Sequence, residues 1–333
     1  ILALMNTKDE LIDGAVLYLR IYLLGMPALG LYNFGNAVLS AAGDTKRPLY
    51  YLAFAGVVNV ILNLFFVIVC HLGVAGVALA SMISQFISAF LILRALLTGK
   101  EKYCLRLSEI RFDKRKAAGI LKIGIPSAFQ YSLFAFANLF VQSSVNSFDH
   151  VLVEGNSAAA NADPLVYDMM AAFYTACSSF IAQNFGARKK KRILQTYLIC
   201  LFYSFITSLV LGVGIYLARY PFLYLFTSDK AVVEAGITRL SIMALSYSAS
   251  AFMDASIAAS RGLGKTAVPT FVVVMGSCVF RIIWIYTIFA YFHTIQSLYI
   301  LYVFSWGITA IAENIYFFHV YRHTLTGKTE SHL

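Results

Sequence analysis

Charged residues are scarce in this chain. Only 13% of its 333 residues are Asp, Glu, Lys or Arg, whereas 60% are hydrophobic. A soluble domain of this length could not keep so much apolar surface away from water. In a lipid bilayer, by contrast, an apolar helix satisfies its own backbone hydrogen bonds. The composition, with a mean hydropathy of +0.74, therefore predicts an all-α integral membrane protein.

Motifs for catalysis, nucleotide binding and metal binding are also lacking. The five Cys residues contain no Cys-x-x-Cys pair and form no grouping with His, so we expect neither a metal site nor a disulfide framework. Gly262 to Thr266 look like the end of a phosphate-binding loop, but Ala259 stands where that loop requires glycine. We therefore expect no catalytic residues, no cofactor and no bound nucleotide.

Long apolar stretches fill most of the chain instead. Each is long enough, as a helix, to cross a hydrocarbon core of about 30 Å. The stretches are residues 16–42, 49–70, 74–97, 117–147, 158–185, 193–218, 235–262, 268–292 and 296–320. We therefore expect nine transmembrane helices.

Basic residues account for the net charge of +10, and they gather in alternate loops. Clusters of Lys and Arg follow the first, third, fifth, seventh and ninth spans, and the densest lie in residues 100–116 and 188–192. By the positive-inside rule these loops and the C-terminus are cytoplasmic. The basic residues are therefore topology signals of a multi-pass protein, and we expect membrane lipids rather than nucleic acid as its partner.

An internal repeat divides the chain into two lobes. Gly43 and Gly264 lie 221 residues apart, and so do Pro48 and Pro269. Parallel repeats in apolar surroundings are typical of transporters. If the second copy is complete, the first copy lacks about three helices at its start, so we expect an N-terminally truncated chain that does not transport by itself.

The repeat and the charged segments predict four regions. Residues 1–97 are the second half of the first lobe, and residues 98–116 are a cytoplasmic connector. The connector alternates apolar with basic residues, which fits an amphipathic helix lying on the membrane surface. Residues 117–320 are a complete second lobe of six helices, and residues 321–333 are a polar cytoplasmic tail.

Five short motifs occur in a fixed order along the two lobes. They are Ala42-Gly-Asp-Thr-Lys-Arg-Pro48, Gly73-Val-Ala-Gly-Val-Ala-Leu-Ala80, Ile123-Gly-Ile-Pro126, Ile181-Ala-Gln-Asn-Phe-Gly-Ala187 and Arg261-Gly-Leu-Gly-Lys-Thr266. Their order and spacing resemble the multidrug and toxic compound extrusion (MATE) family. The resemblance implies two pseudo-symmetric six-helix bundles, twelve transmembrane helices in the full protein, of which this chain holds the fourth to the twelfth. It also implies exchange of cytoplasmic organic cations for H⁺ or Na⁺.

The resemblance implies a cation-binding site in the first lobe, which falls on Asn59, Asn63 and Ser81. The i, i+4 spacing puts Asn59 and Asn63 on one helical face, where two amide oxygens can point at one ion. Asn63 stands where the family pattern has Asp. Since an amide cannot take up a proton, the identity of the coupling ion stays open between H⁺ and Na⁺. Hydrogen bonding between helices is the alternative role of the two Asn residues.

Ionisable residues inside apolar spans are further candidates, because charge is costly there. The 221-residue shift pairs Asp254 with Asn33, so we expect both to line a central cavity. Asp254 would neutralise a cationic substrate or take up a proton, and the alternative is a structural pair with Arg281. Asp168 and Glu313 are candidate proton-relay carboxylates.

Polar residues recur near helical spacing on the fourth span. They are Gln130, Asn138, Gln142, Ser143 and Asn146, and the first three are the candidates for the cavity. Such a stripe either faces the cavity or joins neighbouring helices. Arg20 and Arg239, near the external ends of their spans, are expected to extend their charged ends towards the membrane surface.

Together these observations predict a secondary antiporter rather than an enzyme. It would act as a monomer in a bacterial inner membrane and export small cationic or amphipathic organic substrates by alternating access. One alternative is a flippase for lipid-linked sugars, which needs cationic cavity residues to hold a diphosphate. The other is a membrane enzyme or scaffold that transports nothing and shows no gradient-dependent flux.

Overall fold

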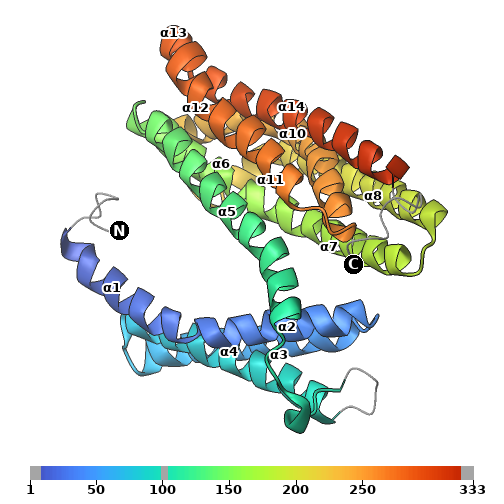
Figure 1. The fold of residues 1–333 in the computed structure, drawn as a ribbon. Helices are drawn as coiled ribbons and strands as arrows, with labels where there is room; N and C mark the ends of the chain where they lie inside the picture. The colour runs from blue at the N-terminus through green and yellow to red at the C-terminus, as the bar shows by residue number, and fades with distance from the viewer. Residues whose placement is uncertain (1–8, 99–103, 324–333) are drawn as a thin grey trace. The chain divides into compact units, whose positions relative to one another are not determined.

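The computed structural model describes residues 9–98 and 104–323 (Figure 1). Within these ranges the regular elements are helices, and no strand occurs. The chain divides into two compact units, Ile1–Phe112 (unit 1) and Asp113–Leu333 (unit 2). Each unit is described separately below.

The described residues of unit 1 form four α-helices. They are α1 (Asp9–Leu24), α2 (Met26–Ala41), α3 (Lys46–Leu64), which continues as the π-helix η2 (Phe65–Val69), and α4 (Gly73–Thr98). The axes of α1 and α2 bend by 43° at Gly25. Pro27 in the first turn of α2 explains the break, because proline has no backbone N–H to donate to α1. A Cβ atom at Gly25 would meet the side chain of Gln85, so glycine allows α4 to pack closely here.

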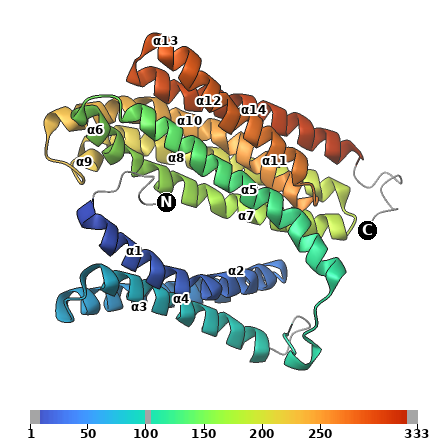
Figure 2. The same ribbon diagram turned by 60° about the vertical axis from the view of Figure 1, so that its left-hand side comes forward.

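Unit 2 is built around one buried helix. Its elements are α5 (Lys114–Val145), α6 (His150–Ala160), α7 (Ala162–Gly186), α8 (Lys190–Leu217), α9 (Arg219–Leu223), α10 (Lys230–Gly262), α11 (Ala267–Val273), η4 (Val274–Val279), α12 (Phe280–Trp284), η5 (Ile285–Phe289), α13 (Ala290–Phe292) and α14 (Ile295–His323). The helix α10 packs against α6, α7, α8 and α14 (Figures 1 and 2). Small residues along it, among them Ser250, Ala255 and Ala259, let these neighbours approach closely.

The span from Ala267 to Phe292 is not a regular α-helix. Two π-helical stretches, η4 and η5, flank the short α12. π-Helical turns inside α-helices occur frequently at functional sites. In unit 2 they flank Arg281, which is discussed below.

The repeated motif forms the same turn in both units. Gly43 ends α2 with φ of 91°, and Gly264 follows α10 with φ of 73°. These positive values suit glycine, and the backbone N–H groups there bond back to the preceding helix. Pro48 and Pro269 then occupy the first turns of α3 and α11. The sequence repeat therefore corresponds to a repeated helix–turn–helix corner.

The expected membrane spans are confirmed. In the described ranges, eight helices are long and apolar enough to cross a membrane, and the bent pair α1–α2 makes a ninth if it is one span. The connector differs from expectation. Between Cys104 and Asp113 its regular structure is the 3₁₀ turn Leu107–Glu109 (η3) rather than an amphipathic helix, and residues 99–103 lie outside the described residues.

The C-terminal end also differs from the expected boundary. The helix α14 continues to His323, three residues into the segment expected to be a polar tail. Residues 324–333 of that segment lie outside the described residues.

Candidate functional site

A cavity of about 540 Å³ lies within unit 2. Its lining residues come from α5, α6, α7, α10, α12 and α14. Its aromatic walls are Tyr131, Phe134, Tyr167, Tyr174, Tyr299, Tyr302 and Trp306. The volume and the apolar walls suit a small organic molecule.

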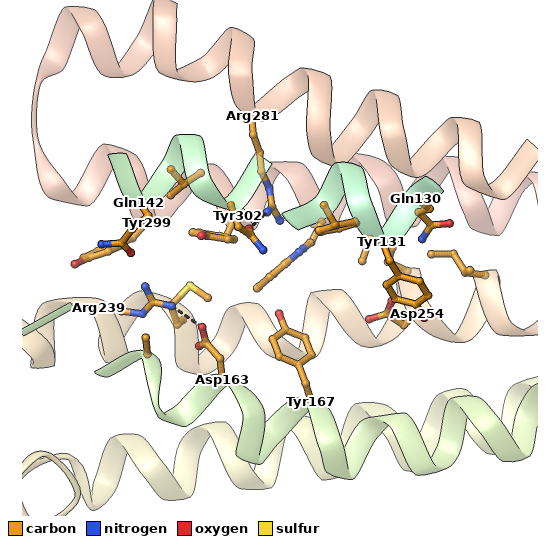
Figure 3. Close-up of a pocket in the computed structure, with 18 of the residues that line it drawn as sticks. Gln130, Tyr131, Gln142, Asp163, Tyr167, Arg239, Asp254, Arg281, Tyr299 and Tyr302 are labelled. Carbon is orange, nitrogen blue, oxygen red and sulfur yellow. Dashed lines mark hydrogen bonds and ion pairs between the residues drawn. The ribbon is translucent and has the colours of Figure 1, made fainter. Parts of the chain in front are cut away.

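Five ionisable side chains of opposite sign line this cavity. They are Arg239, Arg261, Arg281, Asp163 and Asp254. Figure 3 shows Arg281 reaching inward from α12, with Arg239 and Asp163 at one end of the cavity and Asp254 at the other. Charges inside a membrane span are costly unless they are paired or functional. The hydrogen-bond and ion-pair partners of each charged side chain therefore show whether its role is structural or functional.

One end of the cavity holds a closed ion-pair network. The Nη2 atom of Arg239 lies 2.6 Å from Asp163 Oδ2, and its Nη1 atom donates to Asn156 Oδ1 at 2.7 Å. The hydroxyl of Tyr247 donates to Asp163 Oδ1 at 2.5 Å. These bonds join α6, α7 and α10. Arg239 is therefore buried in a structural network instead of extending to the membrane surface.

Arg281 occupies a different environment. Its side chain is only 1% exposed, and its Nη1 atom donates to Asn138 Oδ1 at 2.8 Å. The guanidinium carbon lies 4.6 Å from the ring centre of Tyr302 and 5.2 Å from that of Phe134. Both distances are within the range of cation–π attraction. No carboxylate of the described residues comes within ion-pair distance of Arg281, so the structural pair with Asp254, the alternative raised by the sequence, does not form.

The opposite end of the cavity combines two carboxyl groups with one arginine. Asp254 lines the cavity, and Arg261 follows it two turns later on α10. Arg261 Nη2 donates to Gln130 Oε1 at 3.1 Å. Glu313 of α14 is fully buried, and neither of its oxygens has a hydrogen-bond partner in the structure. Arg261 interacts electrostatically with both carboxyl groups.

The polar stripe of α5 lies along the cavity. Gln130, Asn138 and Gln142 all line it. Gln130 accepts hydrogen bonds from Arg261 and Thr270, whereas Gln142 bonds to Asn146 on its own helix. Gln130, through these bonds, and Asn138, through its bond from Arg281, therefore also join helices.

Asp168 does not join these groups. It is exposed on α7 and does not line the cavity. Two cavity residues, Asp163 and Arg261, escaped sequence analysis because each stands near the end of an apolar stretch. The break between α6 and α7 at Asn161 brings Asp163 inward, and hydropathy alone carries no signal for that break.

The candidate cation site of unit 1 is built from uncharged groups. Asn63 Nδ2 donates to Asn59 Oδ1 at 3.0 Å, and Asn59 Nδ2 donates to Ser84 Oγ at 3.3 Å. The hydroxyl facing Asn59 is thus that of Ser84, while Ser81 contributes its carbonyl oxygen to Ser84 one turn away. The Oδ1 atom of Asn63 is buried without a partner and is the oxygen most available to a cation.

The symmetry partner proposed for Asp254 lies elsewhere in unit 1. Asn33 is exposed on α2 and is not part of the Asn59–Asn63 cluster. Within the described ranges, no group of three or more His, Cys, Asp or Glu side chains has metal-binding geometry.

Comparisons with known proteins identify relatives of this chain. "Probable multidrug resistance protein YpnP" of Bacillus subtilis is 34% identical over 194 residues, which are 58% of this chain and 43% of that protein. "FAD transporter" of Shewanella oneidensis is 25% identical over 223 residues, which are 65% of this chain and 49% of that protein. The chain spans about half the length of these curated relatives.

A solved structure has the same fold. It is described as an outward-facing multidrug resistance MATE family transporter of the MOP superfamily, and it superposes with a TM-score of 0.90 at 21% identity, covering 98% of this chain and 73% of that chain. A family model described as MatE matches residues 1–65 and 126–287. Because that match covers more than half of the chain, the protein belongs to the MatE family, as its sequence motifs indicate.

Proposed function

We propose that this protein is a secondary active transporter that exports small organic molecules in exchange for H⁺ or Na⁺. The observation that carries the proposal is the cavity in unit 2, where aromatic walls surround five ionisable side chains of membrane-spanning helices. A transporter needs an ion site whose occupancy favours one conformation over another. Alternating access of the two lobes would supply the two conformations.

The carboxyl groups of Asp254 and Glu313 are the proposed coupling site. A carboxylate buried without a hydrogen-bond partner is stable only when a proton, a cation or a counter-charge neutralises it. Arg261 can compensate one of the two negative charges but not both. One proton or one cation is therefore needed at this end of the cavity. Proton uptake is the simpler case, because neither oxygen of Glu313 has a hydrogen-bond donor that would stabilise the ionised carboxylate.

A second coupling site is proposed in unit 1, at Asn59, Asn63 and Ser81. Its amide and hydroxyl oxygens could bind Na⁺ but could not take up a proton. The two sites thus favour different ions. If transport requires the unit 2 site, the coupling ion is H⁺; if it requires the unit 1 site, the coupling ion is Na⁺.

The proposed setting is the inner membrane of a bacterium, with the monomer as the transporting unit. Lys190 Nζ donates to the carbonyl oxygen of Arg322 at 2.8 Å, so the basic α7–α8 turn and the end of α14 lie on the same side of unit 2. The basic clusters therefore support a common cytoplasmic side that includes the C-terminus.

The substrate class is a further part of the proposal. Sequence analysis expects small cationic or amphipathic organic molecules. The names of the two relatives given above, a multidrug resistance protein and an FAD transporter, do not agree on a substrate. Flippase activity on lipid-linked sugars is the second candidate, and the cavity arginines are the observation that favours it.

Dye export tests the proposal. The complete gene would be expressed in efflux-deficient cells, and accumulation of cationic ethidium and anionic carboxyfluorescein would be followed under imposed H⁺ or Na⁺ gradients. We expect one gradient to lower accumulation of at least one dye. Unchanged accumulation of both dyes under both gradients, with the protein present in the membrane, would reject drug antiport and favour the flippase.

A further inference from the structure

The buried charge of Arg281 has no compensating carboxylate within ion-pair distance among the residues that the structure describes. Arg281 lies in α12, in the middle of the span Ala267–Phe292, and is 1% exposed. Its hydrogen bonds go to Asn138 Oδ1 and Ser305 Oγ, both of which are neutral. An unpaired charge in such surroundings costs several kcal/mol. A group outside the polypeptide that carries negative charge would remove much of this cost.

The positive charges of the other two cavity arginines are compensated by acidic groups. Arg239 has Asp163 at 2.6 Å. Arg261 has two carboxyl groups within electrostatic range, Asp254 and Glu313. Arg239 forms an ion pair, and Arg261 acts on its two carboxyl groups from beyond ion-pair distance, whereas no carboxylate in the described residues lies within ion-pair distance of Arg281. Of the three, Arg281 is therefore the one whose charge is available to a ligand.

The guanidinium group of Arg281 is held in place for such a contact. Asn138 binds its Nη1 atom at 2.8 Å and Ser305 binds its Nε atom at 3.3 Å. Among the described residues, none accepts a hydrogen bond from its Nη2 atom. The rings of Phe134 and Tyr302 flank the group. A fixed guanidinium recognises carboxylate and phosphate oxygens better than a freely moving ammonium does.

Flat aromatic surfaces stand next to this charge. The rings of Tyr302 and Trp306 lie 5.3 Å apart, and Tyr167 meets the ring of Trp306 edge-on at 6.1 Å. All three side chains line the same cavity as Arg281 (Figure 3). A ligand that places an anionic group on Arg281 would therefore find an aromatic wall for the rest of its structure.

We propose that the substrate of this cavity is an aromatic organic anion whose carboxylate or phosphate group binds Arg281. The proposal rests on the transport function proposed above and specifies its substrate class, in place of the organic cations expected from sequence. Asp254, at the far end of the cavity, is then left to the coupling ion. The anion is either a soluble molecule or the headgroup of a lipid, since both present the same chemistry to Arg281.

Ligand binding to the purified protein, made from the complete gene, tests the proposal. The protein would be placed in nanodiscs of phosphatidylcholine, and fluorescence anisotropy would follow carboxyfluorescein, with ethidium as the cationic counterpart. We expect saturable binding of carboxyfluorescein. Arg281→Gln should weaken it by about tenfold or more, since a hydrogen bond to a charged group is lost. Arg281→Lys, which keeps the charge but not the planar fork, should weaken it less.

Arg192→Gln is the matched control, because Arg192 is an exposed arginine of α8 in the same unit. It should leave carboxyfluorescein binding unchanged. Wild-type protein that binds ethidium but not carboxyfluorescein would overturn the proposal, and so would equal carboxyfluorescein binding by wild type and a folded Arg281→Gln. If Arg281→Gln does not fold, the test rests on the wild-type protein and on Arg281→Lys. Carboxyfluorescein binding by Arg281→Lys that equals that of the wild type, at both low and high salt, would exclude a contact specific to the guanidinium fork and overturn the assignment.

A further arm identifies the source of the anion. Replacing part of the phosphatidylcholine by phosphatidylglycerol either displaces carboxyfluorescein, which supports a lipid headgroup at Arg281, or leaves it bound, which supports a soluble anion. Failure of the transport function gives a different result. Carboxyfluorescein would then bind through Arg281, yet neither dye would move under an H⁺ or Na⁺ gradient.

Discussion

Units 1 and 2 place different chemistry inside their spans. The polar cluster of unit 1 consists of amides and hydroxyls, and its groups mostly satisfy one another. The cavity of unit 2 contains three arginines and two aspartates, with a buried glutamate beside it. Neutral groups can join helices or bind a metal cation, whereas charged groups respond to protons and to charged ligands. If transport is coupled through protonation or a charged ligand, the groups of unit 2 are therefore the ones that can respond.

The largest expected effect concerns the ion pair at one end of the unit 2 cavity. Asp163→Ala leaves Arg239 buried without its carboxylate, and we expect a loss of about 3 to 5 kcal/mol in the free energy of unfolding. Thermal unfolding of the purified protein would measure it. Replacing both partners, with Asp163→Leu and Arg239→Met, should recover much of the loss. Equal stability of Asp163→Ala and wild type would show that the pair is not structural.

The next prediction sharpens the role of charge in coupling. Glu313→Gln keeps the shape of the side chain but cannot exchange a proton, so gradient-dependent dye export should fall about tenfold or more. Asp254→Asn should act in the same direction. Glu154→Gln, which changes an exposed carboxylate of α6, is the matched control. Normal export by Glu313→Gln would move the coupling site away from unit 2.

A third prediction compares the packing of the two units. A Cβ atom at Gly212 would collide with the backbone carbonyl of Ala244 on α10, so Gly212→Ala should destabilise unit 2 by about 1 to 3 kcal/mol. A Cβ atom at Gly25 would collide mainly with the movable end of Gln85 and would lie 3.3 Å from the backbone oxygen of Tyr22, so Gly25→Ala in unit 1 should cost less. Thermal unfolding compares the two, and Gly214→Ala, with open space around it, is the control. A larger loss for Gly25→Ala would reverse the expected order.

The smallest expected effect lies in the amide cluster of unit 1. Asn63→Ala removes one i, i+4 hydrogen bond to Asn59 within α3, and such pairs stabilise a helix by about 0.2 to 0.5 kcal/mol. Dye export should therefore change less than about threefold. Complete loss of Na⁺-dependent export in Asn63→Ala, with a stable protein, would break the comparison and make unit 1 the coupling unit.

The sequence predicts the fold more fully than it predicts the site. The membrane spans follow from apolar length alone, and the repeat fixes equivalent corners at Gly43 and Gly264. The cavity depends on which face each residue presents, and hydropathy along a span does not carry that information. Asp163 and Arg261 were missed for this reason, and Asp168 turned out to be exposed.

The pairing of charges was the least predictable property. Arg239 lies near a span end, which favours an extended, solvated side chain. The break at Asn161 instead brings Asp163 beside it. Asp254 and Arg281 looked like natural partners in an apolar environment, but they belong to different parts of the cavity (Figure 3). Which charges meet depends on tertiary structure across four helices.

The π-helical stretch η4 has a consequence for the direction in which Arg281 points. A π turn holds about one more residue than an α turn, and one residue corresponds to about 100° of rotation around the helix axis. Because η4 precedes α12, the azimuth of Arg281 relative to α11 is offset from that of an unbroken α-helix. Deleting a single residue within Val274–Val279 would therefore convert the π-helical stretch to regular α-helix and keep the present direction of the Arg281 side chain. Inserting one residue after η4 would instead turn the guanidinium away from the cavity.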